Sequence, residues 1–323
     1  MIRVGIIGGA GYTAGELLRI LINHPEVEIA FVNSQSNAGN PVWQVHSGLI
    51  GDTELKFTDQ LPFNDVDVLF FCTAHGDSLK FMEAHGSEIP ENCRIVDLAQ
   101  DFRLAGDHDF IYGLPEFQRH RIAGAFHVAN PGCFATCIQL ALLPAFANGL
   151  VSDDVHVNGI TGSTGAGVKP SATTHFSWRS DNISIYKTFR HQHLLEINET
   201  LHKLETDYSG RLLFVPQRGC FARGIFVTAY TRCDAPLEEV QEIYSNYYSD
   251  AVFTHVVSSA PDMKQIVGTN KALVYVDKFE DQLLMVSTID NLLKGAAGQA
   301  VQNMNLMFGL PEDTGLRLKP IGF

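Results

Sequence analysis

The N-terminal stretch constrains the fold of this chain more than any other. An apolar run from Arg3 to Ile7 has strand character, a glycine-rich turn runs from Gly8 to Gly15, and the apolar residues of Glu16 to Leu21 recur at helical spacing. Strand, glycine turn and helix in this order predict a dinucleotide-binding unit. Such turns also join strands to helices that bind no ligand, so the motif alone leaves the cofactor open.

The small residues of this turn have separate predicted roles. Gly8 and Gly11 allow a tight turn and a close approach of backbone to a pyrophosphate, while Ala14 or Gly15 allows the helix to pack closely on the sheet. The predicted cofactor contacts of this segment are Gly8, Gly11, Tyr12, Thr13, Ala14 and Gly15.

The end of the second predicted strand, Val27 to Val32, bears on the choice of cofactor. A free ribose 2′-hydroxyl usually meets an Asp or Glu there, whereas this chain has Asn33 to Ser36. Hydroxyls and amides tolerate a 2′-phosphate that a carboxylate would repel, so we predict NADP(H), bound in part by Ser34 and Ser36. No arginine stands there, which predicts a modest preference.

Two further buried strands are predicted, Asp67 to Thr73 and Ile95 to Leu98. The first leads to His75 and Gly76, predicted cofactor contacts, although His75 could equally be a loop residue that touches nothing. The second leads to Arg103, whose planar guanidinium suits a carboxylate or phosphate. The alternative for Arg103 is a surface ion pair with Asp101.

Cys133 follows the turn Asn130-Pro131-Gly132, between a β-prone segment that ends at Ala129 and an apolar helical pattern that continues to Pro144. The sulfur would therefore lie beside the first N–H groups of a helix. The positive end of the helix dipole favours a thiolate, which is a nucleophile. The alternative is a buried cysteine that only packs.

Beyond a predicted strand at Val155 to Ile160 lies a second glycine-rich loop, Gly162 to Gly167. Its N–H groups could form an anion nest, and Ser163, Gly165 and Gly167 are predicted cofactor contacts. A flexible hairpin is the alternative.

The segment from Tyr186 to Glu196 carries two histidines. On an extended segment His191 and His193 would face the same way, and His193 and Glu196 share one face of a helix that begins there. A metal site is the weaker alternative, because no third ligand cluster is present and Cys133 gives the histidines another task. We therefore predict no metal.

The remaining second half is rich in strands. Strands are predicted at Ile225 to Thr231, Leu273 to Val276 and Leu283 to Ile289, and helices at Leu237 to Tyr248, near Glu196, and after a loop at Asp290. This pattern predicts a mixed sheet covered by helices on one face.

Composition excludes several classes of protein. A chain of 323 residues with 45% hydrophobic content ordinarily forms two domains, and a net charge of −13 without a basic run argues against nucleic acid. Six cysteines without a CxxC pair predict reduced thiols. The strand pattern starts within three residues of the N-terminus and no apolar run is long enough for a membrane, so we expect a cytoplasmic protein with no signal peptide.

Motifs in both halves of the chain together resemble those of the N-acetyl-γ-glutamyl-phosphate reductases of arginine biosynthesis. They are Gly8 to Arg19, Asp101 to Arg103, Tyr112 to Glu116, Asn130 to Cys133, His191 to His193 with Glu196, and Gly295 to Asn303. The resemblance covers nearly the whole chain, and the ordered set is much more specific than any single motif.

The resemblance implies an α/β protein with a Rossmann NADP-binding domain and a second α/β domain with a mixed sheet, like that of aspartate-semialdehyde and glyceraldehyde-phosphate dehydrogenases. We expect the first domain to comprise residues 1–132 with 303–323 and the catalytic and oligomerisation domain residues 133–302. A helix that returns to the first domain, with Asn303 at the cofactor, and a homodimer or homotetramer are also implied.

The resemblance also implies a mechanism. Cys133 attacks the γ-acyl phosphate, phosphate leaves, and hydride from NADPH reduces the thioester to the semialdehyde. His191 or His193 is the general acid–base, oriented by Glu196 or Tyr186. The remaining predicted roles fall to arginines: Arg103 for the phosphate, and Arg190, Arg218 or Arg223 for the α-carboxylate.

Other functions stay open at this point. The same chemistry could act on an N-succinylglutamyl or an N-acyl-aminoadipyl phosphate, since the acyl group cannot be read from these residues. A cysteine-dependent acyl hydrolase or transferase would use Cys133 and His191 without a dinucleotide. A Rossmann-type sensor would bind NADPH and leave Cys133 unreactive.

Overall fold

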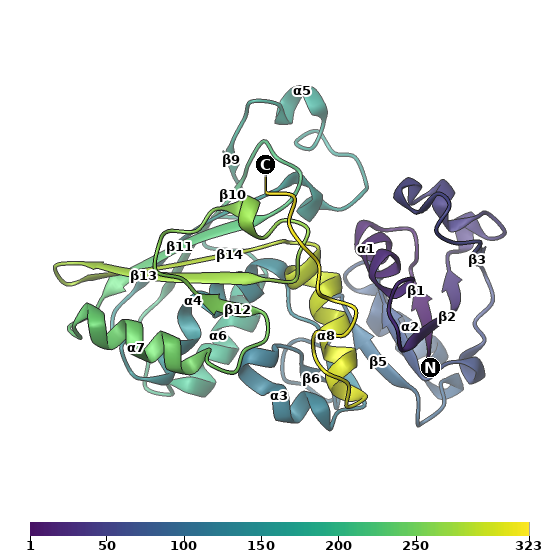
Figure 1. Ribbon diagram of the computed structural model, residues 1–323, viewed down its shortest axis with the longest axis horizontal. Coiled ribbons are helices and arrows are strands. Elements are labelled where there is room, and N and C mark those ends of the chain that lie inside the picture. Colours follow the sequence, from purple (N-terminus) through teal and green to yellow (C-terminus); the bar gives the residue numbers. More distant parts are fainter. Residues whose placement is uncertain (323) are drawn as a thin grey trace. The chain divides into compact units, whose positions relative to one another are not determined.

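The computed structural model describes residues 1–322 and divides into two compact units (Figure 1). Unit 1 comprises Met1–Gly132 and Ala296–Arg317, and unit 2 comprises residues 133–295 with the C-terminal segment from Leu318. The first boundary lies at the residue expected from the sequence, whereas the return to unit 1 begins at residue 296 rather than 303 and ends at Arg317 rather than at the end of the chain. It begins earlier because the whole of α8 (Gly298–Met307) contacts α1 and α3 of unit 1.

Unit 1 is built on a parallel sheet of seven strands in the order β3-β2-β1-β4-β5-β7-β6. The strands are β1 (Ile2–Ile7), β2 (Val27–Asn33), β3 (Phe57–Thr58), β4 (Val68–Phe71), β5 (Arg94–Asp97), β6 (Ile111–Tyr112) and β7 (His127–Ala129). The helices are α1 (Tyr12–Leu21), α2 (Asp77–His85), α3 (Pro115–Ala123) and α8. The order reverses at β1, next to β4, which is where dinucleotides bind in Rossmann folds. The predicted Rossmann unit and its strands are confirmed.

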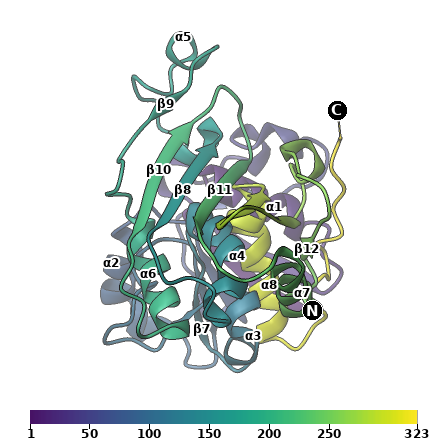
Figure 2. The ribbon, with the colours of Figure 1, turned by 90° about the vertical axis from the view of Figure 1, so that its left-hand side faces the viewer.

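Unit 2 is built on a mixed sheet of seven strands in the order β12-β13-β14-β11-β8-β10-β9. The strands are β8 (Val155–Thr161), β9 (Ser184–Ile185), β10 (Leu212–Arg218), β11 (Ile225–Arg232), β12 (Thr254–Val256), β13 (Ala272–Phe279) and β14 (Gln282–Ile289). Figures 1 and 2 show α4 (Cys133–Ala147), α6 (His193–Leu204) and α7 (Leu237–Tyr247) on one face of this sheet. Every second residue of β8 is buried, as expected for a sheet covered on one face. The prediction from the sequence is confirmed.

Helix α4 is the apolar centre of unit 2. Thirteen of its residues are buried, and the helix passes through Pro144 to end at Ala147. All faces of α4 are apolar, because the helix packs against the strands β11, β13 and β14 and also against the helices α6 and α7. Its first residue, Cys133, is therefore attached to one of the most firmly packed elements of the chain.

One segment of unit 2 leaves the sheet. Residues 168–189, here called the arm, lie between β8 and α6 and carry the short helix α5 (Phe176–Arg179) and the edge strand β9. Figures 1 and 2 show the arm projecting from the β9–β10 edge. Among residues 1–322, no helix is long and apolar enough to cross a membrane, and no group of three potential metal ligands is present.

Candidate active site

The position of Cys133 is the one expected from the sequence. The strand β7 ends at Ala129, three residues turn, and Cys133 opens α4 with a partly exposed side chain. The N–H groups of the first helical turn have no partners further back in the helix, and their dipoles favour an anion on the sulfur. The cysteine is therefore placed as a nucleophile would be, and the alternative of a buried packing cysteine is not supported.

The absence of a side chain at Gly295 allows the backbone there to pack directly against Cys133. A Cβ atom on Gly295 would lie 2.8 Å from the Cβ atom of Cys133 and 3.3 Å from the carbonyl oxygen of Asp290. Only a residue without a side chain fits at this distance. The backbone here forms the π-helical turn Leu293–Ala297, and wide turns of this kind are common at functional sites. The small residues 295–298 are visible in the sequence, but the sequence does not show that Gly295 approaches Cys133.

His191 lies in an aromatic pocket next to the nucleophile. Its ring contacts the rings of Phe134, Tyr186 and Phe214, with centroids 5.6, 5.8 and 5.6 Å away. Phe134 is the residue after Cys133, so this pocket adjoins the sulfur. Burial, together with the positive charges of Lys187 and Arg218, lowers the pKa of His191 to about 4. His191 is therefore neutral at neutral pH.

The two histidines occupy a turn at the start of α6, so the shared face that they would have on an extended segment does not apply. The N–H of His193 donates to Nδ1 of His191 at 3.3 Å, and the ring centroids are 4.6 Å apart. His193 begins α6, and its Nε2 lies 3.9 Å from Oε1 of Glu196 in the first turn. Glu196 is buried, so its carboxylate is available chiefly to groups within the site. The predicted pairing of His193 with Glu196 agrees with this geometry.

Tyr186 and Arg218 complete the cluster around Cys133. The Arg218 guanidinium carbon lies 4.7 Å from the centroid of the Tyr186 ring. Burial, and then the nearby Cys133, raises the pKa of Tyr186 to about 12, so its hydroxyl keeps its proton. Nε of Arg218 is buried and has no hydrogen-bond partner among residues 1–322. A buried donor without an acceptor is suited to an anionic substrate group.

The other predicted arginines are placed differently. The partly exposed Arg223 makes a bidentate pair with the buried Asp290 carboxylate, at 3.1 and 3.0 Å. Arg103 is buried in unit 1, where it donates to the carbonyl oxygens of Asn130 and Leu98, so it is not the surface residue of the alternative interpretation. Arg190 is exposed. Of the three arginines proposed for the α-carboxylate, the geometry favours Arg218.

The glycine-rich loop after β8 is not an anion nest. The N–H groups of Gly162, Ser163 and Thr164 donate to carbonyl oxygens of residues 221–224, and those of Gly165 and Gly167 donate to carbonyls within the loop. A Cβ on Gly162 would lie 2.3 Å from the carbonyl oxygen of Ala222. The glycines serve this close packing of two backbones. A contact of Ser163, Gly165 or Gly167 with a cofactor stays a prediction, without nest geometry to support it.

Asp290 and Asn291 are structural residues that sequence reasoning missed. The fully buried Asp290 carboxylate accepts from the N–H groups of Gly268 and Leu292 in addition to Arg223. Asn291 accepts from the Gly224 N–H and donates to Thr164 Oγ1. Together they fix the backbone directly after β14, which leads into the π-helical turn that packs against Cys133. Only tertiary contacts identify them, although an Asp-Asn pair directly after a buried strand was a usable signal.

The glycine turn of unit 1 fits a dinucleotide. Gly8 has φ +80°, and a Cβ on it would lie 2.8 Å from the Cys72 carbonyl oxygen. Around Gly11, in contrast, a Cβ would meet nothing within 4 Å, no side chain caps α1, and no acidic residue lies in its first turn. The N-terminus of α1 is thus open to a phosphate. Ala14 packs inside, whereas Gly15 makes room for His46 rather than for the sheet.

The other predicted cofactor contacts lie along the carboxyl ends of the unit 1 strands. His75 is exposed, and the N–H of Gly76 donates to Asp101 at 2.8 Å. Asn303 is buried and donates to the Gly113 carbonyl oxygen, while its own Oδ1 has no hydrogen-bond partner in the described chain. A contact of Asn303 with the cofactor stays a prediction.

Asp97 at the end of β5 was not predicted. Its carboxyl is fully buried and accepts from Ser78 Oγ at 2.6 Å. Burial raises its pKa to about 6, opposed by the hydrogen bonds from Ser78 and from the Ala99 N–H. An Asp at the carboxyl end of a buried strand, at the sheet edge where cofactors bind, could have identified Asp97 as a residue near the site.

Comparisons with known proteins agree with both units. Residues 3–125 match the family model for the semialdehyde dehydrogenase NAD binding domain, and residues 133–291 match the semialdehyde dehydrogenase dimerisation domain. The chain is 60% identical to the N-acetyl-gamma-glutamyl-phosphate reductase of Parabacteroides distasonis over all of both chains, and 53% identical to that of Christiangramia forsetii over 99% of both. The chain belongs to the N-acetyl-gamma-glutamyl-phosphate reductase family.

Solved structures show the same fold. Aspartate semialdehyde dehydrogenase II of Vibrio cholerae has a TM-score of 0.76 at 17% identity, covering 96% of this chain and 98% of its own. Aspartate semialdehyde dehydrogenase of Candida albicans, solved with NADP, has a TM-score of 0.70 at 15% identity, covering 95% and 98%. The family's NAD binding domain removes the basis for the alternative of a cysteine hydrolase or transferase that needs no dinucleotide.

Gly295→Ala is expected to lower kcat by about 10- to 100-fold, because the new methyl group must push Cys133 away from its place at the start of α4. Cofactor binding to unit 1 should be unchanged. Gly48→Ala is the matched control, since a Cβ there would meet nothing within 4 Å. Steady-state kinetics and the alkylation rate of Cys133 test this, and an unchanged kcat would contradict the close packing.

Proposed function

We propose that this chain catalyses the NADPH-dependent reduction of N-acetyl-γ-glutamyl phosphate to N-acetylglutamate 5-semialdehyde and phosphate, in arginine biosynthesis. The observation that carries the proposal is Cys133 at the N-terminus of α4, next to a neutral His191 and to Arg218, in a chain whose full-length relatives bear this enzyme's name. Oxidation of the semialdehyde with phosphate and NADP⁺, followed at the absorbance of NADPH, tests it.

The residues of unit 2 have complementary tasks in the proposed reaction. The Cys133 thiolate attacks the acyl carbon, the C–O bond to phosphate breaks, and a thioester remains on the enzyme. NADPH, when bound, supplies the hydride. His193, beside Glu196, donates a proton to the oxygen that develops negative charge when hydride arrives, and takes that proton back as the thiohemiacetal collapses. Breakage of the C–S bond then releases the aldehyde and restores the thiolate.

Substrate binding follows from the same geometry. Arg218 holds the α-carboxylate of the substrate with the buried Nε donor described above. The Tyr186 hydroxyl, protonated at neutral pH, donates a hydrogen bond within the site. His191 keeps the aromatic pocket neutral and donates through Nε2–H, because its Nδ1 accepts from the His193 backbone. Arg103 is proposed to act on the departing phosphate through its planar guanidinium.

We propose further that the acyl group on the substrate is N-acetyl and that its chain is that of glutamate. N-succinylglutamyl and N-acyl-aminoadipyl phosphates would undergo the same chemistry. Comparison of kcat/KM for the three semialdehydes decides among them, and we expect the N-acetylglutamate derivative to be used best. A higher value for another semialdehyde would reassign the substrate and leave the chemistry intact.

Ser34→Asp is expected to reverse the preference for NADP(H) over NAD(H), chiefly through the KM for the cofactor. The Asn37 side-chain amide donates to both Ser34 Oγ and Ser36 Oγ, at 3.0 and 3.1 Å, which leaves each hydroxyl hydrogen free to donate to a 2′-phosphate. One or two such bonds at about 1 kcal/mol each give roughly 5- to 30-fold discrimination in the wild type. A carboxylate would repel the phosphate instead.

The control for this substitution is Ser87→Asp, which adds the same charge at an exposed position beyond the C-terminal end of α2. It should leave the ratio of the two KM values unchanged. If Ser34→Asp also leaves the ratio unchanged, or if the wild type uses NADH as well as NADPH, the end of β2 does not select the cofactor.

A further inference from the structure

His46 contacts the glycine turn of unit 1 at two residues. Its Nε2 lies 2.7 Å from the Gly9 carbonyl oxygen, and because a carbonyl oxygen only accepts, Nε2 carries the hydrogen of this bond. A Cβ atom on Gly15 would lie 2.6 Å from Nδ1 and 3.0 Å from Cε1 of the same ring. The imidazole therefore packs on the backbone at the start of α1 while it donates to the residue that follows Gly8.

The hydrogen bond fixes the orientation of one peptide group. The Gly9 N–H donates to the Asn33 carbonyl oxygen at the end of β2, at 2.8 Å, and the Gly9 carbonyl oxygen accepts from His46. In a planar trans peptide the N–H points opposite to the C=O, so the Ala10 N–H points away from His46. Ala10 is partly exposed, and its N–H has no acceptor among residues 1–322. This donor belongs to the turn at which Rossmann folds bind a pyrophosphate.

The segment that carries His46 has its own anchors. Residues 38–56 leave the sheet between β2 and β3, and the N–H of Val42 donates to the Leu55 carbonyl oxygen at 2.9 Å, which closes the base of the segment. Val42 and Leu49, one on each side of His46 in the sequence, are buried. The bond from His46 to Gly9 therefore joins two parts of unit 1 that are held separately.

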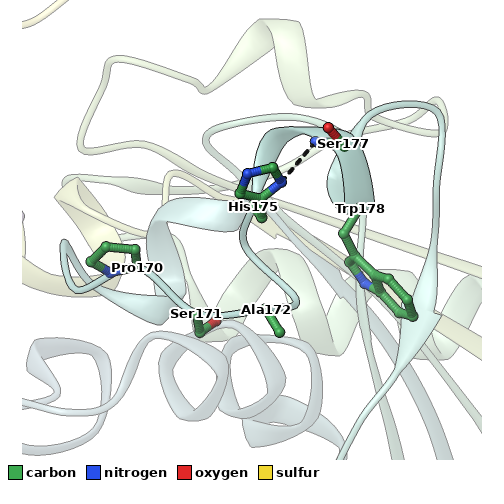
Figure 3. Close-up of a pocket in the computed structure, with 6 residues that line it drawn as sticks. All are labelled: Pro170, Ser171, Ala172, His175, Ser177 and Trp178. Atoms are coloured by element: carbon green, nitrogen blue, oxygen red, sulfur yellow. Dashed lines mark hydrogen bonds between the residues drawn. The ribbon is translucent and has the colours of Figure 1, made fainter.

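A histidine of the arm provides a contrast. Figure 3 shows His175, whose Nδ1 accepts from the N–H of Ser177, two residues further along the chain, at 3.3 Å. That bond caps the start of α5 and is purely local. The bond from His46 spans 37 residues and ends on the glycine turn, so its loss affects a tertiary contact at the cofactor site.

Gly15 supports a specific role for this contact. The residue lies inside α1 and is not among the glycines with positive φ, so the backbone does not require glycine there. Glycine in a helix interior costs about 1 kcal/mol relative to alanine. The absence of a side chain makes room for the His46 ring, which is the contact that offsets this cost.

We propose that His46 is a positioning residue of the cofactor site, whose hydrogen bond holds the Gly9–Ala10 peptide so that the Ala10 N–H donates to the pyrophosphate of NADP(H). The inference rests on the use of NADP(H) in the proposed function and is independent of the acyl substrate. The pyrophosphate is common to NADPH and NADH. His46 therefore raises the affinity for both cofactors and, unlike Ser34, does not select between them.

His46→Leu removes the donor and keeps an apolar side chain beside Gly15. We expect the Kd of NADPH, measured by fluorescence titration, to rise roughly 5- to 30-fold through loss of this hydrogen bond and of the order it imposes on the turn. The Kd of NADH should rise by the same factor. At saturating NADPH, kcat should stay within about twofold of the wild-type value, because Cys133 and the two active-site histidines belong to unit 2.

Two further variants separate the hydrogen bond from packing. In His46→Gln the side-chain amide nitrogen can occupy the place of Nε2 and donate to Gly9, so the Kd of NADPH should return to within about threefold of the wild-type value. His202→Leu is the matched control. Nδ1 of the exposed His202 also donates to a backbone carbonyl oxygen at 2.7 Å, that of Asn198 in α6, and its loss should leave the Kd unchanged.

Each outcome has a separate meaning. A wild type that does not bind NADPH overturns the proposed function. If the wild type binds NADPH, an unchanged Kd in His46→Leu overturns the positioning role, as does an equal rise in the leucine and glutamine variants. A rise for NADPH alone would place His46 at the 2′-phosphate and also overturn it.

Thermal unfolding verifies that His46→Leu is folded, and Gly15→Ala is the second variant if it is not. The new methyl group must displace the His46 ring from Gly9, whereas alanine itself favours the helix. The Kd of NADPH should therefore rise without loss of thermal stability. An unchanged Kd in Gly15→Ala would overturn the inference.

Discussion

Cys133→Ser is expected to abolish the phosphate-dependent reduction of NADP⁺ by N-acetylglutamate semialdehyde, with a loss in kcat of at least about a thousandfold. The effect is large because a serine hydroxyl at this position keeps its proton, whereas the N-terminus of α4 favours an anionic sulfur. Without the thioester, the acyl group has no enzyme-bound form to accept hydride.

NADPH binding by the Cys133→Ser variant should equal that of the wild type, because the predicted cofactor contacts of the glycine turn belong to unit 1. Cys220→Ser is the control: Cys220 is the exposed free cysteine among the six, so its replacement should leave the rate unchanged. Stopped-flow absorbance measures the loss. Appreciable turnover by Cys133→Ser would exclude a covalent thioester route.

Local sequence patterns predicted the fold well, since strand and helix periodicity is written in neighbouring residues. The strand ends at Ile7, Phe71, Asp97 and Ala129 place their following loops at one edge of a parallel sheet, which topology requires of a Rossmann unit. The start of α4 at Cys133 followed from Pro131 and Gly132 in the same way. The turn chemistry needed no information from distant residues.

Tertiary contacts account for what the sequence left open. The approach of Gly295 to Cys133 joins residues far apart in the chain, and a stretch of small residues does not say what it packs against. The amides of the loop after β8 were open to an anion or to backbone, and carbonyls of residues 221–224 occupy them. The sequence does not distinguish Arg218 from Arg223 as a ligand for the carboxylate of the substrate. In the folded chain Arg223 pairs with Asp290, whereas Arg218 does not.

Burial distinguishes the two histidines as candidates for the general acid–base. Their spacing gave no order between them, because residues two apart face one way on an extended segment. In the folded chain His191 is enclosed by three aromatic rings, whereas His193 opens α6 next to the buried Glu196 carboxylate. A histidine with a pKa of about 4 is a weak base at neutral pH, so the structure favours His193 for proton transfer.

His193→Asn is therefore expected to lower kcat for semialdehyde oxidation by about 10² to 10⁴, the range for loss of a general base. His191→Asn should cost less, about tenfold, because it removes packing and one neutral donor. The pH dependence separates these roles. A base must be unprotonated to act, so the rate falls on the acid side as the base takes up its proton, and His191, already neutral above about pH 5, does not cause that fall.

The fall in rate with decreasing pH, measured above about pH 5, should thus persist in His191→Asn. It should disappear in His193→Asn, whose residual rate should not depend on pH in this range. Glu196→Gln is the companion variant, since it keeps the shape of the partner of His193 and removes its charge. It should lower kcat, because the buried negative charge beside His193 during proton transfer is lost. The reverse pattern, in which the fall in rate is lost in His191→Asn and kept in His193→Asn, would assign the proton transfer to His191 despite its burial.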